Sequence, residues 1–290
     1  MAIQRVFVAG AGLMGHGVGQ VHAAIGKDVV LYEPELARAQ AGRDRIAGNL
    51  DRAVAKGRLD AAVREATLAR IEATDDLTKA RDADIVIEAV FEDLDVKREL
   101  WRELDEVAPE RTLFATNTSS ISIDALAAAV SPGRKARFAG MHFFSPVPVM
   151  PLVELVRGHA TTSETEAAIR ELTVELGKKL IVSADRPGFL VNRILMPFLA
   201  EAMRAYEEGT GSMEDIDTGA KVGLNHPMGP FELADFIGLD VTLNVMQVQY
   251  EGLHAEHMKP PKVLVDLAAA GHLGQKTGRG FYTYPREPKA

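Results

Sequence analysis

The chain has 290 residues, 47% of them hydrophobic, which is enough for one large or two ordinary domains with buried cores. Its formal net charge of -8 argues against a nucleic-acid partner, and the absence of cysteine excludes disulfides, thiolate metal sites and a cysteine nucleophile. No apolar run approaches the roughly 20 residues that cross a bilayer, and a strand-like pattern begins almost at residue 1, so we expect a cytoplasmic protein without a signal peptide or membrane partner.

The first part of the chain alternates short β-branched or aromatic runs with longer helical stretches. The strand-like runs are residues 5–10, 28–33, 84–90, 112–117, 137–144, 151–156 and 178–184. This alternation is typical of β-α-β units on a parallel sheet. The Arg-rich stretch at 35–70 is expected to form one or two exposed helices.

From Phe189 onward the pattern becomes helical. Helices are expected near residues 189–209, 213–222, 230–253 and 261–270, with no strand alternation before the string GFYTY. The turn string DRPG marks a domain boundary near Asp185. We therefore predict a Rossmann-like, mostly parallel α/β domain over 1–185, an all-helical domain over 186–290, and an active site in the cleft between them.

A glycine motif, GAGLMG, directly follows the first strand-like run. In a dinucleotide-binding turn, Gly10 makes the sharp bend, Gly12 lets the backbone approach a pyrophosphate, and Gly15 lets the helix pack on the strand. The start of the helix then faces the phosphate charge. A glycine-rich turn without a ligand is the alternative. The predicted cofactor contacts in this motif are Gly10, Ala11, Gly12, Leu13, Met14 and Gly15.

Glu33 ends the second strand-like run, about 20 residues beyond the glycines, where an acid binds the adenosine ribose. A carboxylate there repels a 2′-phosphate, so NAD is favoured over NADP. The alternative is a solvated loop acid, since Pro34 follows it.

Seven strings in the same order resemble the 3-hydroxyacyl-CoA dehydrogenase family: GAGLMGHG, IEAVFEDLDVKRELW, TNTSSISI, GMHFFSPVPVMPLVELV, RPGFLVNRIL, GLNHPMGPFELADFIGLD and GHLGQKTGRGFYTY. The resemblance runs nearly end to end. It implies reversible, NAD-dependent oxidation of an (S)-3-hydroxyacyl-CoA to a 3-oxoacyl-CoA, and a homodimer formed through the helical domain. The chain length is similar to that of the bacterial members acting on 3-hydroxybutyryl-CoA.

One histidine, His142, precedes two aromatics, and one glutamate, Glu154, lies inside the aliphatic run LVELV. A buried carboxylate is costly unless it is paired, so Glu154 requires a partner. A lone histidine beside apolar residues is more often part of a core. The resemblance implies instead that His142 takes the 3-hydroxyl proton as general base and that Glu154 holds its other ring nitrogen.

The resemblance also carries over two polar contacts to the reacting hydroxyl and the thioester carbonyl. Ser119 in NTSS and Asn192 in FLVNR match them. Their alternatives are a helix cap for Ser119 and a bridge to a neighbouring loop for Asn192.

Further cofactor contacts are implied by the same resemblance. Glu92 and Lys97 match contacts to the nicotinamide ribose, although both would also suit a salt-bridged helix face. The other positions that match cofactor contacts are Ala89, Asn117, Ser119, Ser145 and Lys276.

For coenzyme A, the matching positions are Asn49 and Lys56, together with Ser119. Asn49 stands where the family often has serine, and Lys56 keeps a charge for a phosphate. A solvated basic helix face is the alternative. The sequence near His142 departs from the commonest form of the family at two further positions. Ser145 replaces the usual asparagine, and Pro151 replaces the usual lysine.

No metal site is predicted, because the histidine pair His254 and His257 looks like a frayed helix end and hydride transfer needs no activated water. Two other functions stay open: a dehydrogenase of a free 3-hydroxy acid, and a non-catalytic NAD-binding structural protein. Joint retention of His142, Glu154, Ser119 and Asn192 favours the enzyme, since a binder would not need all four.

Overall fold

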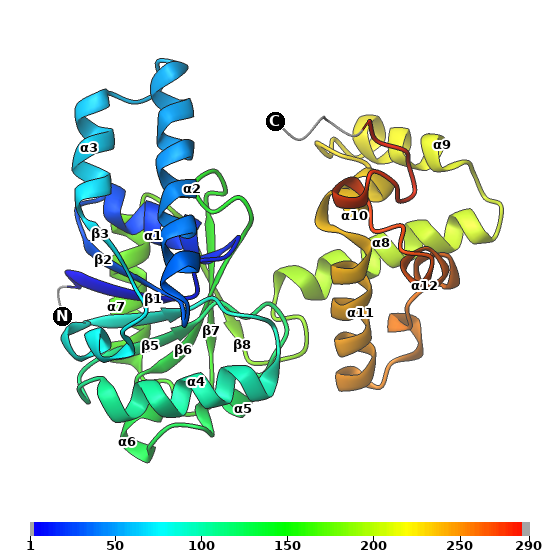
Figure 1. Cartoon of the computed structure of the whole chain (residues 1–290). Coiled ribbons are helices and arrows are strands. Elements are labelled where there is room, and N and C mark those ends of the chain that lie inside the picture. The colour runs from blue at the N-terminus through cyan, green and yellow to red at the C-terminus, as the bar shows by residue number, and fades with distance from the viewer. Residues whose placement is uncertain (1–2, 286–290) are drawn as a thin grey trace. The chain divides into compact units, whose positions relative to one another are not determined.

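The computed structural model describes residues 3–285, which divide after Arg186 into two compact units. The first unit is built on a sheet of eight strands (Figure 1). The strands are β1 (Arg5–Ala9), β2 (Asp28–Tyr32), β3 (Ile71–Thr74), β4 (Ile85–Glu88), β5 (Leu113–Thr116), β6 (Phe138–Phe143), β7 (Leu152–Arg157) and β8 (Lys179–Ala184).

The strand order is β3-β2-β1-β4-β5-β6-β7-β8, and only β6 and β7 run antiparallel to each other. The chain order reverses beside β1, so β1 and β4 lie next to each other with their carboxyl ends at the same edge. In sheets of this kind the ligand crevice opens where the order reverses. The strand-like runs of the sequence correctly predicted seven of these strands, and the Rossmann-like fold class is confirmed.

Helices cover both faces of the sheet, which explains why central strands such as β4 and β5 are buried throughout. On one face, Val18, Ile46 and Ile169 belong to a single core cluster. On the other face, Trp101 packs against the rings of Phe114 and Phe138, at centroid distances of 4.8 and 4.9 Å. The helices of this unit are α1 (Gly15–Ala24), α2 (Leu36–Ala55), α3 (Ala61–Ala69), α4 (Leu94–Val107), α5 (Ile123–Ala127), α6 (Pro132–Lys135) and α7 (Ser163–Glu175), with a 3-10 turn at Leu77–Asp82.

The second unit is helical and has its own core, which includes Met203, Phe231 and Leu264. Its helices are α8 (Val191–Glu207), α9 (Met213–Thr218), α10 (Pro230–Ile237), α11 (Leu239–Leu253) and α12 (Lys262–Ala269), with a π turn at Gly219–Gly223 and 3-10 turns at Glu256–Met258 and Gln275–Thr277. The helical character of this region is as predicted. No helix within residues 3–285 is long and apolar enough to cross a membrane.

Three local predictions differ from the structure. Strand β3 was missed because its sequence, IEAT, places Glu72 and Ala73, which are both depleted in strands, between the two strand formers. The helix expected over 230–253 is two helices, because Gly238 has a φ of +103° and ends α10. The string GFYTY does not form a strand, since the buried carboxylate of Asp235 accepts the backbone N–H groups of Phe281 and Tyr282.

His22 lies fully buried in α1 and gives a test of stability against pH. Its Nδ1 donates to the carbonyl of Val18 at 2.7 Å, and within residues 3–285 its Nε2 has no hydrogen-bond partner. Burial, reinforced by the nearby charges of Lys27 and Lys178, lowers the pKa of His22 from 6.5 to about 4. The unfolded chain therefore binds this proton first, so stability is retained above pH 6.5 and is lost as the pH falls towards 4.

We expect His22→Leu to remove this acid sensitivity. Between pH 7 and pH 5 the wild type should lose roughly 2 kcal/mol more unfolding free energy than the variant. The reason is that each pH unit below the unfolded pKa of His22 lowers the stability of the wild type by ~1.4 kcal/mol. Urea unfolding at both pH values measures the difference. Equal losses in the two proteins would show that His22 does not titrate on unfolding.

Candidate active site

The glycine loop lies at the carboxyl end of β1, against the segment that follows β4. Gly10 has a φ of +106°, and a Cβ there would lie 2.5 Å from the carbonyl oxygen of Ala89. A Cβ on Gly15 would lie 1.7 Å from the carbonyl oxygen of Gly10, whereas a Cβ on Gly12 would meet nothing within 4 Å. Packing therefore requires glycine at two of the three positions, and the open side of Gly12 leaves room for a ligand beside the start of α1.

Glu33 follows β2 and lies against the same loop. Its Oε1 accepts the N–H of Ala11 at 2.7 Å, and Arg45 from α2 donates to the carbonyl of Ala11 at 3.4 Å. The carboxylate is thus held beside the loop where a dinucleotide places its adenosine ribose. These residues fit NAD, which needs an acceptor for the ribose hydroxyls and open backbone for the pyrophosphate.

His142 and Glu154 are register partners across the antiparallel pair β6 and β7. The Nδ1 of His142 lies 3.0 Å from Oε2 of Glu154, and both side chains are buried. A carboxylate accepts the Nδ1 proton, so the neutral ring carries its basic lone pair on Nε2. The ring of Phe144 packs on the imidazole, with 4.5 Å between centroids. The pairing that the sequence made reasonable is therefore present, in an arrangement that suits a general base.

A second carboxylate, Glu92, organises the segment that follows β5. It accepts hydrogen bonds from the hydroxyl of Thr118 at 2.6 Å and from the N–H and hydroxyl of Ser119 at 2.9 and 3.3 Å. Burial alone would raise the pKa of Glu92, but the Lys97 ammonium and these hydrogen bonds outweigh it and lower that pKa. Glu92 therefore stays ionised at neutral pH and holds Ser119 at the carboxyl edge of the sheet.

Lys97 and Asn117, both predicted cofactor contacts, have structural partners. Lys97 is 1% exposed and lies 2.5 Å from Glu88 and 3.2 Å from Glu92. The Oδ1 of Asn117 accepts the N–H of Phe143 at 2.8 Å, next to His142. Ser145 lies in the loop between β6 and β7. The structure thus brings most of the predicted residues of the first unit to one edge of the sheet.

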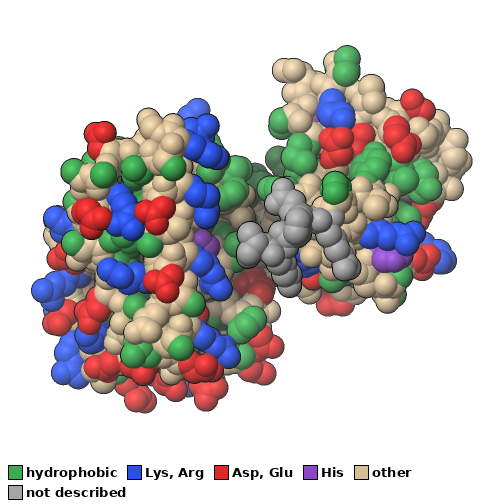
Figure 2. Space-filling view, turned by 45° about the horizontal axis from the view of Figure 1, so that its top comes forward, with side chains coloured by type: hydrophobic (Ala, Val, Ile, Leu, Met, Phe, Trp, Pro, Cys, Tyr) green, Lys and Arg blue, Asp and Glu red, His purple; other side chains and the backbone are tan. Residues whose placement is uncertain are grey.

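Two of the positions predicted to contact coenzyme A, Asn49 and Lys56, lie in α2 and directly after it. Asn49 donates to Gln20 at 3.1 Å and accepts from Arg52 at 2.5 Å, while Lys56 is exposed at the end of the helix. Arg43, by contrast, donates to the carbonyls of Leu68 and Ile71, so its role is structural. Figure 2 shows both basic and acidic side chains on the visible surface of the first unit.

Two predicted residues belong to the second unit. Asn192 lies in α8, where its carbonyl accepts a hydrogen bond from Gln249 at 2.8 Å. The Nζ of Lys276 contacts both carboxylate oxygens of Asp240, at 2.5 and 2.6 Å. The predicted contacts of Asn192 with the substrate and of Lys276 with the cofactor stay predictions.

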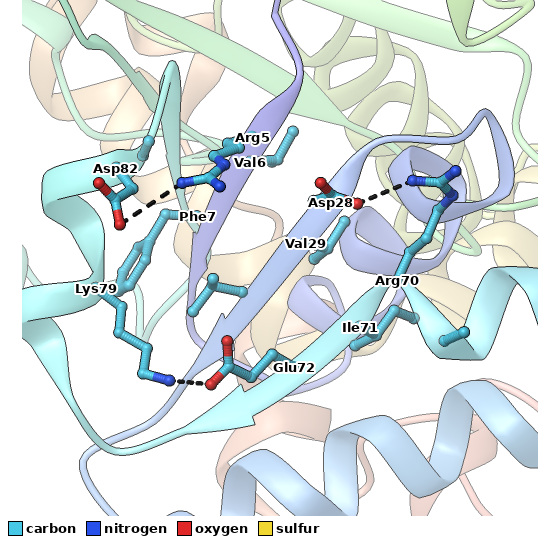
Figure 3. Close-up of a pocket in the computed structure, with 13 residues that line it drawn as sticks. Arg5, Val6, Phe7, Asp28, Val29, Arg70, Ile71, Glu72, Lys79 and Asp82 are labelled. Atoms are coloured by element: carbon cyan, nitrogen blue, oxygen red, sulfur yellow. Dashed lines mark hydrogen bonds and ion pairs between the residues drawn. The ribbon is translucent and has the colours of Figure 1, made fainter.

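A hollow of about 450 Å³ is formed near the amino ends of β1, β2 and β3 (Figure 3). Ion pairs surround it, among them Arg5 with Asp82 at 3.6 Å and Arg70 with Asp28 at 2.9 Å. It lies away from the glycine loop, at the end of the strands where such sheets do not bind dinucleotides. Among residues 3–285, no cluster of three His, Cys, Asp or Glu side chains suits a metal ion.

Comparison with known proteins decides the family. Residues 5–186 match the NAD binding domain of 3-hydroxyacyl-CoA dehydrogenase, and residues 188–284 match its C-terminal domain. The chain belongs to the 3-hydroxyacyl-CoA dehydrogenase family. It is therefore an NAD-dependent oxidoreductase, and the family, cofactor and activity expected from the sequence are confirmed.

Individual relatives agree over nearly the whole chain. A 3-hydroxybutyryl-CoA dehydrogenase from Bradyrhizobium diazoefficiens is 47% identical, covering 97% of this chain and 96% of that protein. One from Mycobacterium tuberculosis is 44% identical, covering 98% of this chain and 99% of that protein. The crystal structure of (S)-3-hydroxybutyryl-CoA dehydrogenase from Ralstonia eutropha, also 44% identical, has a TM-score of 0.95 and covers 98% of this chain and 100% of its own.

Sequence reasoning missed Glu88, which joins Lys97 and Glu92 in one ion-pair network. The signal was present, because Glu88 ends the aliphatic run IVI. The rule that a carboxylate in an apolar strand requires a partner, applied to Glu154, holds for Glu88 as well.

Proposed function

We propose that this enzyme oxidises short (S)-3-hydroxyacyl-CoA thioesters, with 3-hydroxybutyryl-CoA as its best substrate. The observation that carries the proposal is the buried His142–Glu154 pair, 3.0 Å apart, in the same sheet whose carboxyl edge bears the glycine loop and Ser119. The relatives named 3-hydroxybutyryl-CoA dehydrogenase, at 47% and 44% identity, support the short acyl chain.

In the proposed reaction, NAD held beside the glycine loop and Glu33 would supply the acceptor for the hydride that leaves C3 of the substrate. His142 takes the hydroxyl proton at Nε2, and the charge of Glu154 stabilises the imidazolium that forms. Ser119 and Asn192 contact the reacting hydroxyl and the thioester carbonyl. The burial of Glu154 strengthens its effect on the ring, because little water screens the pair.

An initial-rate comparison tests the substrate class. NADH formation is measured with 3-hydroxyacyl-CoA thioesters of increasing chain length, beside the corresponding free acids. Coenzyme A contributes binding energy that orients C3, so the free acid should lose kcat as well as affinity. If the free acids are turned over as fast as their thioesters, the result supports the alternative function, a dehydrogenase of a free 3-hydroxy acid.

Cofactor preference tests Glu33. Wild-type kcat/KM should favour NAD, and Glu33→Ser combined with Pro34→Arg should shift the NAD to NADP ratio by about tenfold or more, since a repulsive carboxylate is replaced by a cation. Glu35→Ser is the matched control, because Glu35 is exposed and pairs with Arg38. A wild-type enzyme that prefers NADP would contradict the assignment.

A charge reversal on α2 tests the coenzyme A assignment. Lys56→Glu should raise KM for the thioester by roughly three- to tenfold at low salt, as expected for one exposed charge, and added salt should narrow the gap. Arg58→Glu, two residues further on, is the control. An unchanged KM for Lys56→Glu at low salt would remove Lys56 from the binding site.

We also propose a cytoplasmic homodimer formed through the second unit. Exposed apolar side chains in that unit support an interface: Ile194, Val222, Leu224 and Phe236. Light scattering on the purified protein measures the mass, and a monomer at micromolar concentration would argue against the dimer.

A further inference from the structure

Glu88 is the last residue of β4 and is 0% exposed. Its Oε1 lies 2.5 Å from Lys97 Nζ and accepts the N–H of Val90 at 2.9 Å. Its Oε2 accepts the hydroxyl of Thr116 at 2.7 Å. The carboxylate therefore ties the carboxyl ends of β4 and β5 to α4, and its partners offset the cost of burying its charge.

Two carboxylates share the single ammonium of Lys97. Glu88 is the nearer, at 2.5 Å, and Glu92 lies at 3.2 Å. Because Glu88 is the closer counter-ion of Lys97, Glu92 can direct its other oxygen to Thr118, Ser119 and Ser120, from which it accepts hydrogen bonds of 2.6 to 3.3 Å.

We propose that Glu88 is a positioning residue for the active site: by binding Lys97 it leaves Glu92 to hold the Ser119 segment in place. This inference rests on the site proposed above. Without the Glu88 charge, Glu92 is the remaining counter-ion of Lys97, and attraction between those two draws Glu92 away from the segment. A displacement of about 1 Å at a group that orients the substrate is enough to cost up to roughly 100-fold in rate.

The first experiment compares Glu88→Gln with a variant of a largely buried ion pair elsewhere in the same unit. Arg134 and Asp105 lie 2.9 Å apart, and Arg134 also donates to the carbonyls of Ala108, Pro109 and Thr112. Asp105→Asn therefore destabilises the unit without touching the proposed site. Thermal unfolding, NADH affinity by fluorescence titration, and kcat with (S)-3-hydroxybutyryl-CoA are measured for each protein.

We expect Glu88→Gln to weaken NADH binding about tenfold and to lower kcat about tenfold or more, from lost positioning. Asp105→Asn should change each by less than about twofold at a similar loss of Tm, because what it weakens is the ion pair with Arg134, away from the proposed site. If Glu88→Gln changes affinity and kcat no more than Asp105→Asn does, its role is structural and the proposal is overturned.

The second experiment asks whether Glu88 acts through Ser119. In a double-mutant cycle, Glu88→Gln should lower kcat much less in a Ser119→Ala background than in the wild type, since the group it positions is already gone. Equal effects in both backgrounds would reject the proposal. The NADH titration needs no turnover, so it tests Glu88 even if the proposed substrate is wrong. A wild type that binds NADH but does not oxidise the thioester would refute the proposed substrate only.

Discussion

His142→Gln is expected to lower kcat by roughly two to four decades, the range typical of losing a general base. Glutamine fills similar space and can hydrogen-bond to Glu154, but it cannot take a proton at neutral pH. NADH affinity should stay within a few-fold of the wild type, because His142 lies on β6 whereas the glycine loop follows β1. Steady-state kinetics and a fluorescence titration measure the two quantities.

The matched control for that variant is His159→Gln. His159 is exposed and follows β7, and its side chain has no part in the proposed site. The control should therefore keep full activity. A His142→Gln enzyme that retains activity within a few-fold of the wild type would rule out His142 as the base.

The sequence predicted the sheet well because the predicted strands have runs rich in β-branched, aromatic or other apolar residues between turn signals. β3 lacks such a run, and it is a strand because β2 offers it parallel partners from Val29 to Tyr32. The break at Gly238 was missed because the flanking residues continue the helical pattern on both sides. In both places the backbone conformation is set by a feature that the local periodicity of the sequence does not reveal.

The family resemblance indicated the pair His142 and Glu154, and the structure gives its physical basis. The register of the adjacent antiparallel strands β6 and β7 places the two residues opposite each other. The Glu88–Lys97–Glu92 network joins a strand, a helix and a loop, and its distances depend on packing that no local pattern encodes. The resemblance indicated Glu92 and Lys97, but only the structure shows that Glu88 joins them.

Glu154→Gln should lower kcat by about one to three decades, less than His142→Gln does. The amide keeps the shape of the side chain and can still accept the Nδ1 proton of His142, but it no longer carries the charge that stabilises an imidazolium. Because Glu154 is 0% exposed, this charge acts with little screening by water. NADH affinity is expected to be unchanged, since the effect belongs to the proton transfer.

A double variant shows whether Glu154 acts through His142. Once His142 is glutamine, no imidazolium forms, so adding Glu154→Gln should lower kcat little further. A full additive loss in the double variant would mean that Glu154 supports the fold instead, as would a kcat for Glu154→Gln equal to that of the wild type. Thermal unfolding of all three variants separates these outcomes from partial unfolding, because a loss of kcat measured well below Tm reflects chemistry in the folded enzyme.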